Sequence, residues 1–247
     1  MKIVAHRGDC ARFPENSLAA FEHAIRAGAD LLETDVRIAA DGVPVCWHDP
    51  DLARVTGTAT PIAGTTAAGL AAIALPGDAR VHRLEEILAI ARGRRPLMLD
   101  LKVDDAPARA AIMRAVALAD MADEVVLGVR TPEQAAAYAA TGRPLALLAM
   151  PAEPEGLSGF SPRHLIGARL WEDQVHEAAL ARIRARQLPV WVTAGKRSQG
   201  EAPGFIDAAR LRILSAAGID AVLVNDVQLA VATRGKPAAY HDDPPAG

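Results

Sequence analysis

Cysteine is scarce in this sequence, which holds only Cys10 and Cys46 among 247 residues. Two cysteines exclude the framework of disulfide bonds that stabilises many small secreted domains. We interpret Cys46 as a buried small side chain on the polar face of a predicted hairpin, and not as a nucleophile. The cysteine content therefore favours a reducing compartment.

A strong excess of charge is also absent. The formal net charge is −3 at pH 7, and the densest basic cluster is the Arg-Gly-Arg-Arg of residues 92–95. This pattern gives no electrostatic reason to expect nucleic acid or an anionic membrane as a partner. Long apolar runs are missing too, and the N-terminal MKIVAHRG turns polar too early for a signal peptide. We expect a cytoplasmic protein without a membrane anchor.

What the sequence does contain is an ordinary globular composition. Apolar residues make up 51% of the chain and charged residues 23%, which is enough for a sizeable core. No repeat of fixed period and no linker divides the chain. We therefore predict one domain over residues 1–235, followed by a Pro-rich tail, 236–247, that is predicted to be disordered.

Predicted strands and helices alternate along the chain. Apolar runs and period-two alternation predict strands at 2–5, 31–38, 43–48, 96–102, 125–129, 145–149, 166–170, 190–193 and 221–224. Helical spacing of apolar residues predicts helices at 17–27, 84–92, 106–119, 132–140, 177–186 and 205–217. Residues 49–83, rich in Gly, Ala, Thr and Pro, are expected to form a lid or loop with one short helix at 66–73.

This order of elements favours an α/β fold of the (β/α)₈ TIM-barrel type. The strand at 43–48 follows its predecessor too closely for a helical crossover, so it must return antiparallel as the second arm of a hairpin. The eight other strands then suit a barrel of ordinary length. An open doubly wound sheet is the alternative, but it would carry a glycine-rich phosphate loop after the first strand, where Gly8 stands alone.

The predicted hairpin carries several polar groups. Asp41-Gly42 suits the two central positions of a type I′ turn, since both positions need positive φ. In the resulting register Asp35 lies directly opposite His48. Glu33 shares their face because side chains on a strand alternate with period two, whereas Trp47 belongs to the apolar face.

Three acidic residues fall at strand ends. Barrel enzymes place their sites at the C-terminal ends of the strands, where Glu33 and Asp35 end the second strand and Asp100 ends a later one. Carboxylate oxygens are the preferred ligands of hard divalent cations, so this set predicts a site for one Mg²⁺ or Ca²⁺ ion. Zinc is disfavoured because no cysteine or histidine cluster has its ligand spacing.

Two histidines and two basic residues fall near the same strand ends. His6 and His48 are candidates for a general acid and a general base because an imidazole titrates near neutral pH. Arg7 and Lys102 can add positive charge where a phosphoryl group accumulates negative charge. Taken alone, a histidine at a strand end is more often structural, and its predicted pairing with Asp35 is what raises His48 above that default.

Together these residues resemble the glycerophosphodiester phosphodiesterase family. The matching motifs are His6-Arg-Gly, Pro14-Glu-Asn-Ser, the segment 28–37, Asp41-Gly-Val-Pro-Val, His48-Asp with Leu52, Arg54 and Thr56, Leu99-Asp-Leu-Lys, and Trp191. The resemblance implies a (β/α)₈ barrel that hydrolyses a small-molecule glycerophosphodiester to glycerol phosphate and an alcohol, in lipid and glycerol metabolism. It implies that Glu33, Asp35 and Asp100 bind the cation. It further implies that His6 and His48 act as general acid and base, and that the substrate contacts Arg7, Lys102 and Trp191.

Three positions depart from the family pattern, one in the predicted metal site and two nearer the C-terminus. Asp100 replaces the usual Glu and is one methylene shorter. Trp191 is followed by Val192-Thr-Ala where the family has Thr-Val-Asn, and the last strand ends in Asn225-Asp-Val-Gln where the family has Thr-Asp-x-Pro. The alternatives are a metal-dependent barrel lyase acting on a carbonyl substrate and a barrel that binds phosphate compounds without turnover.

Overall fold

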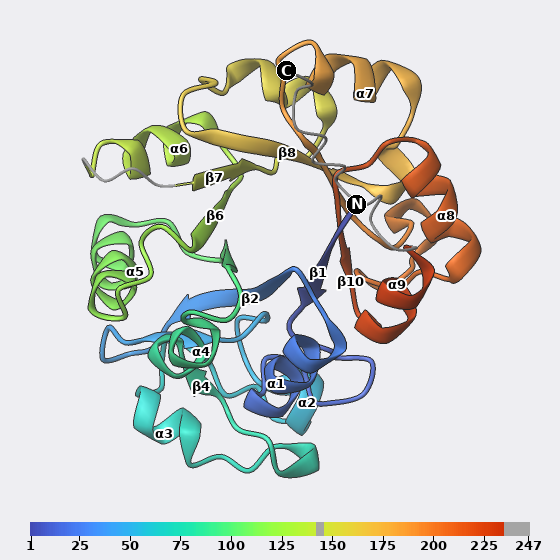
Figure 1. Cartoon of the computed structure of the whole chain (residues 1–247). Helices are drawn as coiled ribbons and strands as arrows, with labels where there is room; N and C mark the ends of the chain where they lie inside the picture. Colours follow the sequence, from blue (N-terminus) through green and yellow to red (C-terminus); the bar gives the residue numbers. More distant parts are fainter. Residues whose placement is uncertain (142–145, 235–247) are drawn as a thin grey trace, which may run out of the picture.

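Eight parallel strands close into a ring in the computed structural model, which describes residues 1–141 and 146–234 (Figure 1). Each strand pairs with the next, and the last pairs with the first, so the predicted (β/α)₈ barrel is confirmed. The ring consists, in order, of β1 (Lys2–His6), β2 (Leu31–Ile38), β5 (Leu97–Leu101), β6 (Val125–Val129), β7 (Ala146–Ala149), β8 (Leu165–Trp171), β9 (Val190–Thr193) and β10 (Ala221–Val224).

Helices surround this ring on its outer face (Figure 1). They are α1 (Leu18–Ala27), α4 (Leu84–Ala91), α5 (Ala106–Leu118), α6 (Pro132–Ala139), α7 (Glu177–Arg184), α8 (Ala208–Ala216) and α9 (Val227–Thr233). Side-chain caps set several starts: Asp207 accepts a hydrogen bond from the backbone of Arg210, so α8 begins three residues after the predicted start at 205. Within the described part of the chain, no helix has both the length and the apolar character needed to cross a membrane.

Two predictions fall on residues outside the described ranges. The predicted strand at 145–149 is observed from Ala146, and its first position is not among the described residues. The predicted disordered tail, 236–247, also lies outside them.

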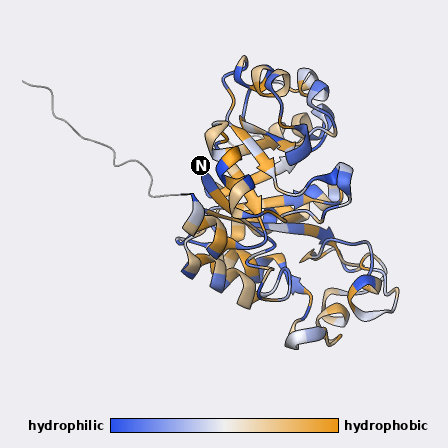
Figure 2. Cartoon of the chain, turned by 90° about the vertical axis from the view of Figure 1, so that its right-hand side faces the viewer, coloured by the Kyte–Doolittle hydropathy of each residue, from blue (hydrophilic) through white to orange (hydrophobic). Residues whose placement is uncertain are grey.

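Side chains that face the inside of the ring change from apolar to polar along the strands. On β1 Val4 is followed by His6, and on β5 Met98 is followed by Asp100. The alternate positions face outward, and Figure 2 shows the strands as the most hydrophobic part of the molecule. The enclosed apolar cluster consists of Val4, Leu31, Met98, Val126, Leu148, Met150, Trp191, Ala221 and Leu223. It forms the floor beneath the polar ends of the strands.

The antiparallel return arm is confirmed, but its register differs from the prediction by one residue. In β3 (Pro44–Cys46) Cys46 lies opposite Val36, so the residue opposite Asp35 is Trp47, whose N–H donates to the Asp35 carbonyl oxygen at 3.1 Å. The predicted pairing of Asp35 with His48 is therefore wrong.

The loop between the two arms explains the shift. Ala39 N–H donates to the Val43 carbonyl oxygen at 2.9 Å, which leaves three residues in the loop instead of two. Among them only Gly42 has positive φ, 77°, whereas a type I′ turn would need two such residues. The new register also places Cys46 in the outer apolar layer with Val36, and not on the polar face as predicted.

Residues 49–83 do not form a loose lid. They contain α2 (Ala53–Thr56), α3 (Ala67–Ala71), the 3₁₀ turn η1 (Pro76–Asp78) and β4 (His82–Arg83), which pairs antiparallel with β3. Together with Trp47, the segment encloses a small apolar core, in which Leu52, Ile62 and Leu70 are almost completely buried. Its packing fixes the chain on either side of His48.

Candidate active site

A cavity of about 400 Å³ lies at the C-terminal ends of the barrel strands. Six of the eight site residues predicted from the sequence line it: His6, Arg7, Glu33, His48, Asp100 and Lys102. Asp35 lies next to them as a neighbour of Glu33 on β2. The fold thus brings together residues from distant parts of the chain. They are the residues predicted from their positions at the C-terminal ends of strands.

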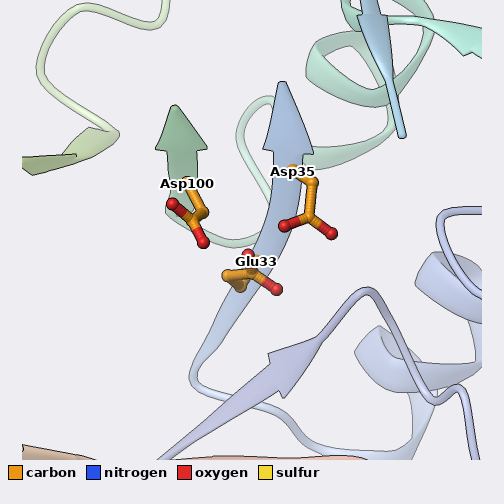
Figure 3. Close-up of side chains that lie close together, drawn as sticks. All are labelled: Glu33, Asp35 and Asp100. Atoms are coloured by element: carbon orange, nitrogen blue, oxygen red, sulfur yellow. The ribbon is translucent and has the colours of Figure 1, made fainter. Parts of the chain in front are cut away.

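The three carboxylates converge as expected (Figure 3). Asp35 and Asp100 lie side by side on the paired strands β2 and β5, and Glu33 precedes Asp35 by two positions. One oxygen of each carboxylate lies within 4.8 Å of one oxygen of each of the others. Glu33 and Asp35 are both only 1% exposed. Buried acids this close repel one another unless positive charge is supplied.

The pKa values of these carboxyl groups reflect their crowding. Burial, followed by the charges of Asp35 and Asp100, raises the pKa of Glu33 well above its usual value. Burial alone would raise the pKa of Asp35 as well, but Arg7 and Lys102 hold it below its usual range. The ion pairs responsible are Arg7 Nε to Asp35 Oδ2 at 2.8 Å and Lys102 Nζ to Asp35 Oδ1 at 3.0 Å. Glu33 is therefore the carboxyl least supplied with positive charge.

Asp100 has two basic partners. Lys102 Nζ lies 2.6 Å from its Oδ2, and the guanidinium of Arg130 pairs with its Oδ1. Arg130 follows β6 and also donates to the carbonyl oxygen of Leu101 at 2.6 Å. The shorter side chain at this position is thus held at both oxygens.

Arg7, in the His-Arg-Gly turn at the end of β1, contacts two of the carboxylates. Its backbone, at φ 55°, directs the N–H to Glu33 Oε2 at 2.9 Å while the side chain reaches Asp35. Gly8 follows at φ 81°, and a Cβ there would come within 2.6 Å of the Ala20 Cβ in α1. Only glycine allows the first helix to approach so closely.

His6 is oriented by Asn225, which directly follows β10. Asn225 Nδ2 donates to the Pro203 carbonyl oxygen at 2.9 Å, so its Oδ1 faces His6 Nδ1 at 2.8 Å. This arrangement assigns the proton of the neutral ring to Nδ1 and leaves Nε2 unprotonated. Burial, and then the charge of Arg7, lower the pKa of His6 to about 4. His6 is therefore a neutral imidazole near pH 7.

A hydrogen bond to Asp49, followed by a chain of ion pairs, holds His48 on the other wall. Its Nδ1 lies 2.7 Å from Asp49 Oδ1, and Asp49 Oδ2 lies 2.5 Å from Arg54 Nε. Arg54 pairs in turn with Glu15 at 2.5 Å, and Glu15 with Arg7 at 3.1 Å. The chain connects the segment after β3 with the turn after β1.

Trp191 is the predicted site residue that the fold does not bring to this cavity. It belongs to the apolar cluster inside the barrel and contacts the pocket at the opposite end, beside Met1 and Asp220. The indole that lines the cavity is instead that of Trp171 on β8. The prediction failed because an inward-facing tryptophan near the start of β9 points into the barrel floor, two positions below the strand end.

The predicted site did not include Arg130, Arg169 and Trp171, which line the cavity, or Asn225, which contacts His6. Each lies within the last three residues of a barrel strand or directly after one. The rule that identified His6 would have identified these residues too, had it been applied to every strand.

Comparison with known proteins gives the family. The family model of the glycerophosphoryl diester phosphodiesterases matches residues 6–141, more than half of the chain. A glycerophosphodiester phosphodiesterase of Bacillus altitudinis is 49% identical over 55 residues, which are 22% of this chain and 22% of the relative. The matched segment thus spans only about a fifth of that relative.

Solved structures show the same fold. A phosphodiesterase of Oleispira antarctica, in complex with the product sn-glycerol-3-phosphate, has a TM-score of 0.80 at 21% identity over 94% of this chain and 96% of that one. A glycerophosphodiester phosphodiesterase of Agrobacterium tumefaciens has a TM-score of 0.74 at 23% identity over 93% and 99%. From the family match, the barrel and the converging strand-end residues, we conclude that this chain belongs to the glycerophosphoryl diester phosphodiesterase family.

Proposed function

We propose that this protein is a metal-dependent phosphodiesterase that hydrolyses glycerophosphodiesters to glycerol phosphate and an alcohol. The observation that carries the proposal is the meeting of two histidines, three carboxylates, Arg7 and Lys102 at one cavity. The family match and the named activities of the relatives agree with this reading. A carbonyl lyase would need neither the second histidine nor the lysine beside Asp100.

The carboxylate cluster suits one Mg²⁺ or Ca²⁺ ion. Three carboxyl oxygens within 4.8 Å of one another form the donor set that hard cations prefer. Glu33 would gain the most, since it has no ion-pair partner among the described residues and its pKa is raised by burial and by its acidic neighbours. When bound there, a divalent cation supplies Lewis-acid stabilisation of negative charge on phosphoryl oxygens.

The two histidines would move the protons. Both have Nδ1 engaged, by Asn225 and by Asp49, which leaves Nε2 of each ring for proton transfer. One ring accepts the proton of the attacking hydroxyl as the new bond to phosphorus forms. The other donates a proton to the alkoxide as the bond to the alcohol breaks. Arg7 and Lys102 would hold the phosphoryl oxygens through charge-assisted hydrogen bonds.

Replacement of either histidine tests this assignment. We expect His6→Ala and His48→Ala each to lower kcat by at least ~100-fold, the usual contribution of a general acid or base. His164→Asn, on an exposed residue with a left-handed backbone, is the matched control and should leave kcat unchanged. Near-wild-type turnover in either of the first two variants would contradict the assignment.

Metal dependence is tested in the same assay. Titration with Mg²⁺ or Ca²⁺ should induce release of glycerol phosphate from glycerophosphocholine or glycerophosphoethanolamine, and EDTA should abolish it. Metal binding without product from any diester would instead favour a binding protein.

A further inference from the structure

Arg169 is a buried cation whose role the proposed reaction leaves open. It is 7% exposed and lies near the end of β8, where its side chain lines the cavity. Its Nε and Nη1 atoms are buried and have no hydrogen-bond partner among the described residues. A buried donor without a partner is costly, and more so when it is charged. The position therefore favours an anion that the described residues do not provide.

The neighbours of Arg169 increase the demand for an anion. Its guanidinium carbon lies 4.6 Å from the centre of the Trp171 ring, and that of Arg197 lies 5.4 Å from the same centre. Burial lowers the pKa of Arg169 to about 10, with Asp100 acting to raise it and Arg130 and Arg197 to lower it, so Arg169 is still charged at neutral pH. Both oxygens of Asp100 are already engaged, by Lys102 and by Arg130. Arg130 is engaged with Asp100, and among the described residues Arg197 pairs with Glu153 alone, at 3.7 Å.

The location of Arg169 shows which part of a substrate it would meet. In the ring of strands β8 lies diametrically opposite β2, which carries Glu33 and Asp35 (Figure 1). On the proposed function the reacting phosphate sits beside β1, β2 and β5, so Arg169 faces the far end of the same ligand. Glycerol carries no charge. An anion at Arg169 that is not the reacting phosphate would therefore belong to the alcohol part of the diester.

We propose that the cavity selects phosphodiesters whose alcohol part carries an oxyanion, either a carboxylate or a phosphate, and that Arg169 determines this specificity. Arginine suits both groups because its planar guanidinium binds two oxygens at once. A quaternary ammonium such as that of choline is disfavoured, because the Trp171 ring that could bind it already carries two guanidinium groups. The inference rests on the proposed function and assigns its substrate class.

Two pairs of substrates isolate the effect of the anion on kcat/KM. Glycerophosphoserine differs from glycerophosphoethanolamine by one carboxylate, and glycerophosphoinositol 4-phosphate differs from glycerophosphoinositol by one phosphate. We expect kcat/KM to be roughly 10- to 100-fold higher for the anionic member of at least one pair, the range for a hydrogen bond to a charged group. The pair that shows the larger ratio identifies the oxyanion, and ratios near one in both pairs would overturn the proposal.

Variants of Arg169 test whether this residue causes the preference for anionic substrates. Arg169→Met keeps an unbranched apolar stem against Trp171 and should bring the ratio close to one, whereas Arg169→Lys should retain part of it. Arg163→Met is the matched control, since Arg163 is exposed, lies just before β8 at the opposite end of the barrel and carries the same charge. Its ratio should equal that of the wild type. An unchanged ratio in Arg169→Met would refute the role of Arg169.

Calorimetry separates this inference from the proposed function. The four compounds are titrated into His48→Ala, which should bind them with little turnover. If the anionic compounds bind more tightly but the wild type turns none of them over, the anion subsite is supported and the hydrolase assignment is contradicted. Turnover of every diester with equal binding would support the hydrolase and remove the subsite.

Discussion

Asn225 decides which nitrogen of His6 carries the proton. Its amide is held in one orientation because Nδ2 donates to the Pro203 carbonyl oxygen, and so Oδ1 can only accept from His6. A histidine with the wrong tautomer loses most of its value as an acid or base even when the ring stays in place. A residue outside the predicted site thus controls one inside it.

Substitution of Asn225 therefore has a specific expected effect. Asn225→Leu keeps the volume but removes the acceptor, and we expect kcat to fall by at least ~10-fold because the ring is no longer held in one tautomer. Asn225→Asp restores the acceptor and adds a negative charge, which favours the imidazolium. The acid limb of its kcat/KM profile should then move to higher pH. A pH profile identical to that of the wild type would show that residue 225 does not act through His6.

Among the elements, the loop between β9 and α8 covers the His6–Asn225 pair. Gly204 in this loop has φ 82°, and its carbonyl oxygen accepts from the Asn225 N–H at 2.8 Å. A Cβ at Gly204 would lie 2.0 Å from Asn225 Oδ1 and 2.9 Å from His6 Nδ1. The loop can therefore pack on the pair only through a glycine.

The same loop offers a matched comparison. Gly200 has φ 73° and open space where a Cβ would lie, so Gly200→Ala should cost about 1–2 kcal/mol for the left-handed backbone alone. Gly204→Ala should destabilise the protein more, and it should also lower kcat because Asn225 must move. Urea unfolding and steady-state kinetics measure the two effects. Equal unfolding free energies and equal kcat values in both variants would show that the close approach does not matter.

The second histidine depends on a different element. The segment after β3 carries His48, Asp49 and Arg54, and its own apolar core packs it beside the barrel. The ion pairs through Glu15 reach Arg7, so the turn after β1 and this segment share one network. The two catalytic candidates are thus held by elements more than forty residues apart in the sequence.

In the whole molecule, the buried carboxylate cluster is expected to be a source of instability that a cation relieves. A ligand that binds only the folded state at 100 times its Kd adds about 2.7 kcal/mol to the free energy of unfolding. We therefore expect Mg²⁺ or Ca²⁺ to raise the Tm and EDTA to reverse the change.

Glu33→Gln is the variant that tests this effect. It keeps the shape and the acceptor for the Arg7 N–H but removes the carboxylate that has no ion-pair partner among the described residues. The metal-free variant should be at least as stable as the metal-free wild type, because it buries no charge there, and its Tm should respond little to metal. A full metal response in this variant would place the cation elsewhere.

Local patterns in the sequence were enough for much of this protein. Alternating and helical spacing predicted the strands and helices, and their order predicted the barrel, because these signals depend on neighbouring residues. The strand-end rule then brought together His6, Glu33 and Asp100, since the closed barrel places all C-terminal strand ends around one opening. Nothing about their distances was needed for that prediction.

Only the tertiary structure decided what depends on register and direction. A three-residue loop in place of a two-residue turn shifted the hairpin by one position, and a single step exchanges the faces of a strand. Position along the strand likewise decided that Trp191 lies in the barrel floor and Trp171 in the cavity. Arg169 and Asn225 acquired their importance from partners, or from the lack of them among the described residues, across the barrel. Contacts of that kind are set by how distant strands close, and no local pattern of residues encodes them.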